Sequence, residues 1–241
     1  MSWHLGRLTG FDLETTGPDP ETARIVTACI VQCGGNQPTD SAVWMSDVDG
    51  EPIPKEAEAV HGISTETAHA QGAPLEEVVA ELVAGITQTV LAGAPVVAMN
   101  ARYDFTVLDR EARRFGVDTL ADTVGGGLRV IDPYVIDKQA DRYRRGSRKL
   151  TALCDHYAVP IGDAHSADAD AIAACRVAWR IGQRFPDLAE LSLDELHEKQ
   201  IEWAADQAAS LQEYFRRKSP DVVVHGEWPL VPAQREGGEE S

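Results

Sequence analysis

Two acidic side chains, Asp12 and Glu14, lie two residues apart at the end of an apolar stretch that begins near Leu5. In a β-strand, residues i and i+2 point to the same face, so this pattern predicts two adjacent carboxylates on one face with Phe11 and Leu13 packed on the other. Like charges this close repel each other unless a cation binds between them or one carboxyl group takes up a proton. The segment therefore predicts a core strand whose end carries oxygen ligands for a hard divalent cation.

Extended and helical segments alternate along most of the chain. Runs of apolar and β-branched residues predict strands over residues 5–14, 24–33, 41–46, 95–99 and 129–132. Apolar residues at helical spacing predict helices over residues 74–91, 100–115, 147–157, 166–184 and 192–215. Strands interleaved with helices of this length indicate an α/β fold in which helices flank a mixed sheet, with the first three strands in an antiparallel meander.

The last of these helices follows a break in the pattern at Phe185 and Pro186. Ser192 followed by Glu195 matches a capping box, which predicts where the helix begins. Gln200 falls within its apolar stripe, so we expect the amide to be hydrogen-bonded inside the protein. The acidic, glycine-containing end of the chain predicts a tail that is disordered at its tip. For 241 residues, one domain with an extension is favoured over two equal domains.

The net charge of −17 argues against a protein that binds nucleic acid electrostatically over its whole surface, because such proteins carry an excess of basic residues. A nucleic acid bound in a small metal-lined cleft stays compatible with this charge. One basic segment stands out around Tyr143, and it consists of Arg142, Arg144, Arg145, Arg148 and Lys149. This segment is either a patch for phosphates or an ordinary solvated loop that leads into a helix.

The sequence predicts a cytoplasmic protein. Its N-terminus has no basic segment followed by an apolar core, which argues against a secretory signal. No apolar stretch approaches the length of a membrane span, so we expect no contact with membranes. The four cysteines show no Cys-x-x-Cys spacing and are expected to be reduced, mostly buried thiols.

A second polar cluster, Asn100 to Asp104, directly follows the strand expected at residues 95–99. With Asn100 as the N-cap, Asp104 lies one turn into the next helix, near the carboxyl end of that strand. Ligand sites in α/β folds gather at this edge of the sheet. The alternative for Asp104 alone is a first-turn carboxylate that the helix dipole stabilises.

A third cluster surrounds Ser166, which is the expected N-cap of the helix over residues 166–184. His165 then precedes the cap and Asp170 is the fourth helical residue, and side chains at these two positions meet in a staple. The imidazole would thus lie beside a carboxylate. Asp168 falls on a different face of the helix. Taken alone, a histidine before a helix is more often structural or solvated than catalytic.

Together these clusters resemble the DEDDh (DnaQ-like) 3′→5′ exonuclease family, relatives of the proofreading subunit of bacterial replicative DNA polymerase and of oligoribonuclease. The resemblance covers about residues 5–184, and the segments 61–64 and 150–157 resemble further family stretches. The three family motifs are matched, in order, by Phe11 to Gly17, by Asn100 to Asp104, and by His165 with Asp170. The chain departs from the family at Met99, where many relatives have His, and at Asp168, where many have a neutral residue.

The resemblance implies a ribonuclease H-like mixed sheet flanked by helices. It divides the chain into an exonuclease domain over residues 1–185 and a C-terminal helical extension, with a partly disordered tail, over residues 186–241. It implies two divalent cations, Mg²⁺ or Mn²⁺, as cofactors. By resemblance, Asp12 bridges the two cations, Glu14 and Asp170 complete one site, and Asp104 holds the other.

His165 is implied as the general base that takes a proton from the attacking water. Four further residues are implied in the substrate site: Leu13, Thr15 and His61 at the terminal nucleotide, and Asn100 at the turn of the second motif. The implied activity is hydrolysis of single-stranded nucleic acid from its 3′ end, which releases nucleoside 5′-monophosphates.

DNA is the favoured substrate, and two alternatives stay open. One is an exoribonuclease that acts on RNA or short oligoribonucleotides. The other is a non-catalytic nucleic-acid-binding module, which the presence of all five motif residues disfavours. The C-terminal helix is a candidate surface for binding a polymerase or for self-association.

Overall fold

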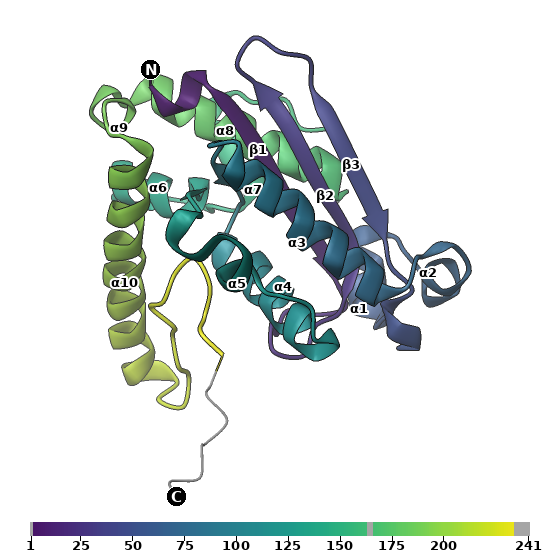
Figure 1. Ribbon diagram of the computed structural model, residues 1–241. Helices are drawn as coiled ribbons and strands as arrows, with labels where there is room; N and C mark the ends of the chain where they lie inside the picture. The colour runs from purple at the N-terminus through teal and green to yellow at the C-terminus, as the bar shows by residue number, and fades with distance from the viewer. Residues whose placement is uncertain (1, 163–165, 234–241) are drawn as a thin grey trace, which may run out of the picture.

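The computed structural model describes residues 2–162 and 166–233. Its central sheet has the strand order β3-β2-β1-β4-β5, and Figure 1 labels the first three strands. The strands are β1 (Arg7–Thr15), β2 (Ile25–Gly34), β3 (Asp40–Met45), β4 (Val96–Val97) and β5 (Val130–Ile131). The first three strands form an antiparallel meander, whereas β4 pairs in parallel with both β1 and β5. The expected mixed sheet is therefore confirmed.

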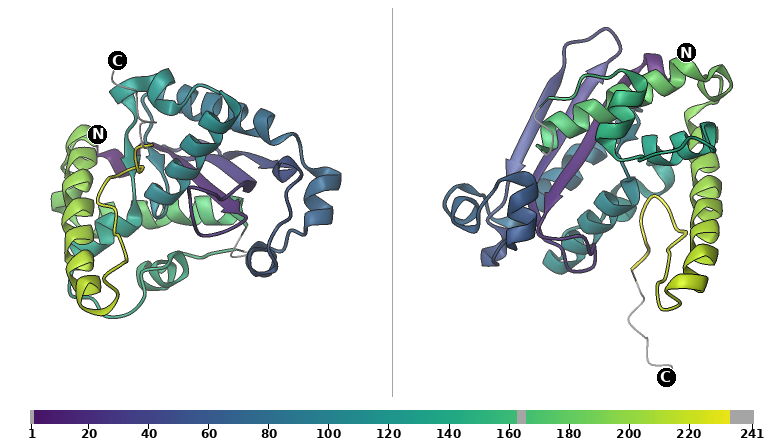
Figure 2. Two further views of the ribbon diagram at one scale, coloured as in Figure 1. Left: turned by 90° about the horizontal axis from the view of Figure 1, so that it is seen from below. Right: turned by 180° about the vertical axis from the view of Figure 1, so that it is seen from behind.

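Helices cover both faces of this sheet (Figures 1 and 2). The helices are α1 (Lys55–His61), α2 (Thr65–Gln71), α3 (Leu75–Leu91), α4 (Ala101–Phe115), α5 (Leu120–Val124), α6 (Pro133–Ala140), α7 (Leu150–Tyr157), α8 (Ala167–Arg184), α9 (Pro186–Ala189) and α10 (Leu193–Lys218). α3 and α4 pack on one face of the sheet, and α8 packs on the other. This layered arrangement confirms the α/β fold class.

The alternation along β1 directs its side chains to two different layers. Phe11 and Leu13 are buried in the core beneath α3 and α4. Asp12 and Glu14 therefore point to the opposite face, which α8 covers. The helix can approach closely because Gly10 has no side chain: a Cβ atom there would lie only 2.6 Å from the carbonyl oxygen of Ala171 in α8. Close packing of α8 on β1 brings the first turn of the helix to the end of the strand.

Two features between β5 and α8 differ from expectation. The helix expected over residues 147–157 begins only at Leu150. A helix that the hydrophobic pattern did not predict, α6, begins at Pro133 with Asp132 as its N-cap, whose side chain accepts a hydrogen bond from the Tyr134 N–H. An Asp-Pro pair is a recognisable helix start, so this signal was present in the sequence.

The long helix α10 lies beside α6 (Figure 1) and also packs against the edge strand β5. It begins at the expected capping box of Ser192 and Glu195. Gln200 is fully buried and makes the expected hydrogen bonds: it accepts from the Asp132 N–H at 2.7 Å and donates to the Val130 carbonyl at 2.9 Å. α10 is thereby fixed to the backbone of the sheet's edge.

After α10 the chain turns back toward α4. Trp228 is buried there, and the Val231 N–H donates to the hydroxyl of Thr106 in α4 at 3.0 Å. The tip of the tail, for which disorder was expected, lies outside the described residues. Among the helices of the described chain, none is long and apolar enough to cross a membrane.

Candidate functional site

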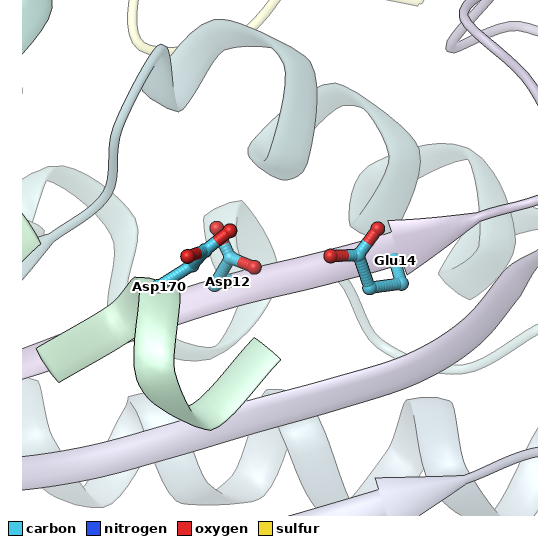
Figure 3. A group of neighbouring side chains, drawn as sticks. All are labelled: Asp12, Glu14 and Asp170. Atoms are coloured by element: carbon cyan, nitrogen blue, oxygen red, sulfur yellow. The ribbon is translucent and has the colours of Figure 1, made fainter. Parts of the chain in front are cut away.

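Three carboxylates from two elements converge at the end of β1. Asp12 and Glu14 project from one face of the strand, and Asp170 reaches them from the first turn of α8 (Figure 3). One ligand oxygen from each of the three lies within 4.8 Å of the others. The structure thus brings together three of the four predicted metal ligands.

Burial and crowding raise the pKa of these groups. Burial raises the pKa of Glu14 to about 7, with a further contribution from the charge of Asp170. Burial also raises the pKa of Asp12 well above its usual range, and the charges of Asp104, Asp170 and Glu14 add to this effect. A bound divalent cation would reverse these shifts because it favours the charged forms. Oxygen donors alone, at this spacing, fit a hard cation better than a soft one.

Asp104, the fourth predicted ligand, lies in the first turn of α4 and is only 4% exposed. Its Oδ1 atom accepts a hydrogen bond from the Leu13 N–H at 3.1 Å. This bond joins the second motif to the strand that carries Asp12 and Glu14. Burial raises the pKa of Asp104, and the hydrogen bond from Leu13 opposes that shift.

The turn before α4 is held by Asp132, a residue that lies outside the three sequence motifs. Asn100 occupies the predicted N-cap position in the left-handed conformation, with φ of 61°, but its side chain makes no capping hydrogen bond. The carboxylate of Asp132 caps the helix instead, because it accepts hydrogen bonds from the N–H groups of Asn100 and Ala101 at 3.0 Å each. The cap comes from a different strand end, so local spacing around Asn100 could not have shown it.

The residues predicted at the terminal nucleotide have different surroundings. Leu13 is a core residue whose backbone bonds Asp104. The Thr15 hydroxyl donates to the Gly17 carbonyl at 3.1 Å and also bonds the Tyr103 hydroxyl, which itself bonds the same carbonyl. Both residues thus support the loop after β1, and their contact with a nucleotide stays a prediction.

His61 is the last residue of α1 and is half-buried. Its Nδ1 atom accepts a hydrogen bond from the Ile63 N–H at 3.1 Å, and burial lowers the pKa of the imidazole. Both observations favour a neutral ring that organises the turn after α1. A role for His61 in binding substrate stays a prediction.

The third motif is only partly described, because His165 lies outside the described residues. Ser166 occupies the predicted N-cap position of α8, and its carbonyl accepts from the Asp170 N–H at 3.0 Å. Asp168 is exposed and is not part of the three-carboxylate group. The predicted difference between Asp168 and Asp170 therefore agrees with the phase of α8.

The acidic residues open into a cleft of about 230 Å³. Asn100, Tyr103 and Asp104 at the start of α4 form one part of its wall, and Leu150 at the start of α7 forms another. The cleft lies at the carboxyl end of β4, the edge at which ligand sites of α/β folds gather. A phosphodiester placed here would lie directly against Asp12, Glu14 and Asp170.

Two arginines of the basic segment have a structural role. The guanidinium groups of Arg144 and Arg148 bind the carboxylate of Asp137 in α6, at 2.7 and 2.8 Å, and Asp137 is fully buried. The Tyr157 hydroxyl donates to the other oxygen of that carboxylate at 2.8 Å. Arg144 and Arg148 thus hold a buried carboxylate, and a phosphate patch formed by the whole segment stays a prediction. Arg142, Arg145 and Lys149 are exposed.

Solved structures of exonuclease I resemble this fold. The E. coli enzyme in complex with a dT13 oligonucleotide matches with a TM-score of 0.62 and 19% identity, over 76% of this chain and 42% of that one. Its zinc-bound complex with single-stranded DNA matches with a TM-score of 0.60 and 20% identity, over 75% and 41%. Exonuclease I from Methylocaldum szegediense matches with a TM-score of 0.64 and 19% identity, over 85% and 46%. The chain thus spans less than half of these proteins.

No curated protein sequence matches the chain. A family model does match: the RNase T model, described as an exonuclease, covers residues 9–178. That range contains β1, the start of α4 and the first turn of α8, the elements that carry the four predicted carboxylates. Since the match extends over most of the sequence, this chain belongs to the exonuclease family that the RNase T model describes.

Proposed function

We propose that this protein is a metal-dependent 3′→5′ exonuclease that hydrolyses single-stranded nucleic acid, with DNA as the first substrate, and releases nucleoside 5′-monophosphates. The observation that carries the proposal is the cluster of Asp12, Glu14 and Asp170, whose ligand oxygens lie within 4.8 Å of one another in an open cleft. Membership of an exonuclease family and similarity to structures of exonuclease I with bound oligonucleotides support it.

The donor set fits hard divalent cations such as Mg²⁺ or Mn²⁺. Asp12, Glu14 and Asp170 would hold one cation, and Asp12 with Asp104 would hold a second. Such a pair supplies charge stabilisation for the attacking and leaving oxygens and makes a water nucleophilic at neutral pH. The chain's own part would be to orient these carboxylates, which are carried by β1, α4 and α8.

His165 is proposed as the base that accepts the proton of the attacking water, on the strength of the family motif. Replacing His165 with Ala should lower kcat by about 10²–10⁴, the range for loss of a general base. The fall of kcat at low pH, which reflects protonation of the base, should also disappear from the pH–rate profile of this variant. A profile identical to that of the unmodified protein would remove His165 from the proposal.

Three further parts belong to this proposal. The 3′ ends of single-stranded DNA are favoured because similar structures bind oligonucleotides, as in the dT13 complex. RNA or short oligoribonucleotides are the alternative, decided by whether the cleft accepts a 2′-hydroxyl. A cytoplasmic location is supported by the four free cysteines. Binding of a polymerase or of a second copy through α10 stays a prediction.

The test is a time course on single-stranded DNA and RNA of one sequence, each labelled at the 5′ end, with Mg²⁺, Mn²⁺ or EDTA. We expect a ladder that shortens from the 3′ end, faster for DNA, and no reaction in EDTA. Faster loss of RNA would select the exoribonuclease alternative. Degradation that persists in EDTA would contradict a metal-dependent enzyme.

Carboxylate variants test the site itself. Asp12→Asn and Asp170→Asn should abolish turnover while the protein stays folded, as judged by circular dichroism. Asp168→Asn is the matched control, because it removes an exposed carboxylate from the same helical turn. Loss of activity in Asp168→Asn equal to that in Asp170→Asn would show that the site has been assigned to the wrong residues.

A further inference from the structure

The acidic cleft continues into two larger cavities. Met99, Asn100 and Leu150 line both the cleft and a neighbouring cavity of about 560 Å³. Lys138 and Arg148 then line both this cavity and a third, of about 400 Å³, between α6 and α10. Because each cavity shares wall residues with the next, the three adjoin one another in sequence. The two larger cavities together are named the α6–α10 groove, and the acidic cleft lies at one end of it.

Three basic side chains that form no salt bridge with the residues that the structure describes line the α6–α10 groove. Lys138 and Lys149 line the middle cavity of the three, and Arg142 lines the far cavity. Within the part of the chain that the structure describes, none of these three side chains forms a salt bridge, whereas Arg148 is bound to Asp137. Asp206 of α10 is the one acidic residue lining the third cavity. In a chain of net charge −17, three cations along one groove that form no salt bridge within the described residues favour an anionic ligand.

Two tyrosines add flat surfaces to the same groove. Tyr134 lines the middle cavity, and the Lys138 ammonium lies 4.8 Å from the centre of its ring. Tyr214 of α10 lines the far cavity and is 50% exposed. Tyr134 is partly buried against the core, and Lys218 lies 4.6 Å from the centre of the Tyr214 ring, so a base would stack on the faces that these lysines leave open. A positively charged groove with accessible aromatic faces is the combination that binds single-stranded nucleic acid, because phosphates contact the cations and bases stack on the rings.

α10 forms a fixed wall of this groove. The Gln207 side chain donates to the Val135 carbonyl of α6 at 3.0 Å, and Gln200, about two turns earlier in α10, donates to the Val130 carbonyl of β5. α10 begins after residue 178, the last residue that the family model matches. One wall of the far cavity, formed by α10, therefore belongs to the C-terminal extension, whereas the opposite wall lies within the residues that the family model matches.

We propose that the α6–α10 groove binds the single strand upstream of the scissile bond, with the 3′ end in the acidic cleft. This inference rests on the proposed function for the identity of its ligand. Lys138, Lys149 and Arg142 bind successive phosphates, and Tyr134 and Tyr214 receive bases. The C-terminal helix thus makes the protein prefer strands long enough to reach α10.

The experiment measures binding of 5′-fluorescein oligo(dT) of two, four, eight and sixteen nucleotides by anisotropy in EDTA, where no turnover occurs. For the unmodified full chain, affinity should rise with length and then level off. Lys138→Ala/Arg142→Ala should weaken the sixteen-mer and reduce the slope of log Kd against log salt concentration by about 1.4, which corresponds to two phosphate contacts on a single strand. Tyr214→Ala should weaken the sixteen-mer about fivefold, the lower end for one stacked base, and leave the salt slope unchanged.

Matched controls separate the groove from general charge and surface effects. Arg176→Ala/Arg180→Ala removes the same charge from α8, outside the groove, and Tyr143→Ala removes a tyrosine that is 90% exposed and lines none of the three cavities. Both should bind the sixteen-mer as the unmodified protein does. Equal losses in the control and groove variants would overturn the proposal.

Two further outcomes would also decide against it. Affinity independent of strand length would exclude an upstream groove, even if hydrolysis with Mn²⁺ is observed. A change of molar mass caused by Tyr214→Ala in light scattering would show that a second copy, and not a strand, occupies the groove. Failure of the proposed function would give a different result. In that case no strand would be hydrolysed with any cation, although binding in EDTA would still depend on strand length.

Discussion

The carboxylate of Asp104 is hydrogen-bonded to the backbone of Leu13, with 3.1 Å between Oδ1 and the amide nitrogen. Leu13 lies between the two acidic residues of β1, so this bond sets the first turn of α4 against the strand at the place where both carboxylates leave it. Asp104 thus has a supporting role in the structure in addition to its proposed role as a metal ligand. The two roles predict different effects for different substitutions.

Asp104→Asn keeps an acceptor oxygen for Leu13 and removes the charge, whereas Asp104→Ala removes both. We expect both variants to lose at least a hundredfold in kcat. Asp104→Ala should also be less stable than Asp104→Asn by about 1–3 kcal/mol, because a buried N–H group is left without its acceptor. Urea denaturation in EDTA measures this difference. Equal stability of the two variants would mean that the bond to Leu13 contributes nothing.

The raised pKa of Glu14 predicts how the stability of the metal-free protein depends on pH. Glu14 titrates at about 7 in the folded protein, whereas an ordinary Glu in the unfolded chain titrates at about 4.3. Between these values the folded state holds more protons, so the free energy of unfolding falls as the pH rises. Glu14→Gln mimics the protonated form and removes this loss.

The melting temperature of Glu14→Gln in EDTA should therefore exceed that of the unmodified protein by an amount that grows from pH 5 to pH 8. Glu202→Gln, at an exposed position of α10, is the control for the replacement of a Glu by Gln away from the site. Adding Mn²⁺ at pH 8 should stabilise the unmodified protein far more than Glu14→Gln. A difference that shrinks as the pH rises would contradict the raised pKa.

Asp132 joins the C-terminal extension to the candidate site. Its two oxygens accept from three backbone N–H groups, those of Asn100, Ala101 and Tyr134, and from the indole of Trp228 at 3.3 Å. Asp132→Ala should lower the free energy of unfolding by about 3 kcal/mol or more, at about 1–3 kcal/mol for each donor left unsatisfied. It should also reduce kcat, because the turn that positions Asp104 loses its cap.

Trp228→Phe removes one of these four bonds and keeps an aromatic ring in the core. It should cost about 1 kcal/mol, the ordinary net value of one hydrogen bond. Urea denaturation of both variants tests the ranking. If Trp228→Phe were as damaging as Asp132→Ala, the packing of the tail, and not the cap of α4, would be the main contribution.

Much of the site could be predicted because it follows from local periodicity. The spacing of Asp12 and Glu14 places both on one face of β1, and the phase of α8 separates Asp170 from Asp168. The long-range pairings could not be predicted in this way. Nothing near Asn100 in the sequence indicates that a carboxylate 32 residues later caps its helix. Similarly, spacing alone does not show that α8 approaches β1 over Gly10.

The basic segment illustrates the same limit. Sequence alone left two alternatives for it, a phosphate patch and an ordinary loop, because five cations close together are compatible with both. The deciding partner, Asp137, lies in a helix that the hydrophobic pattern did not predict, and its burial is a property of the packed structure. Burying a carboxylate is costly unless cations and hydrogen bonds compensate its charge. Two of the five basic residues, Arg144 and Arg148, therefore pair with Asp137.

Because Arg144 and Arg148 pair with Asp137, we expect their replacement to lower the stability of the fold and not its affinity for a strand. Arg144→Ala/Arg148→Ala leaves Asp137 buried without a cation and should lower the free energy of unfolding by about 3–5 kcal/mol. Adding Asp137→Asn should restore most of that loss, because the amide carries no charge and can still accept from Tyr157. Urea denaturation of the double and triple variants measures the recovery.

Arg142→Ala/Arg145→Ala is the matched control, since both side chains are exposed and the change in net charge is the same. It should alter the free energy of unfolding by no more than about 0.5 kcal/mol. Any loss of turnover in Arg144→Ala/Arg148→Ala should be equal on a dinucleotide and on a sixteen-mer, because it reflects the fraction of folded protein. A selective loss on the long strand, with stability unchanged, would instead return these two arginines to the phosphate-binding surface.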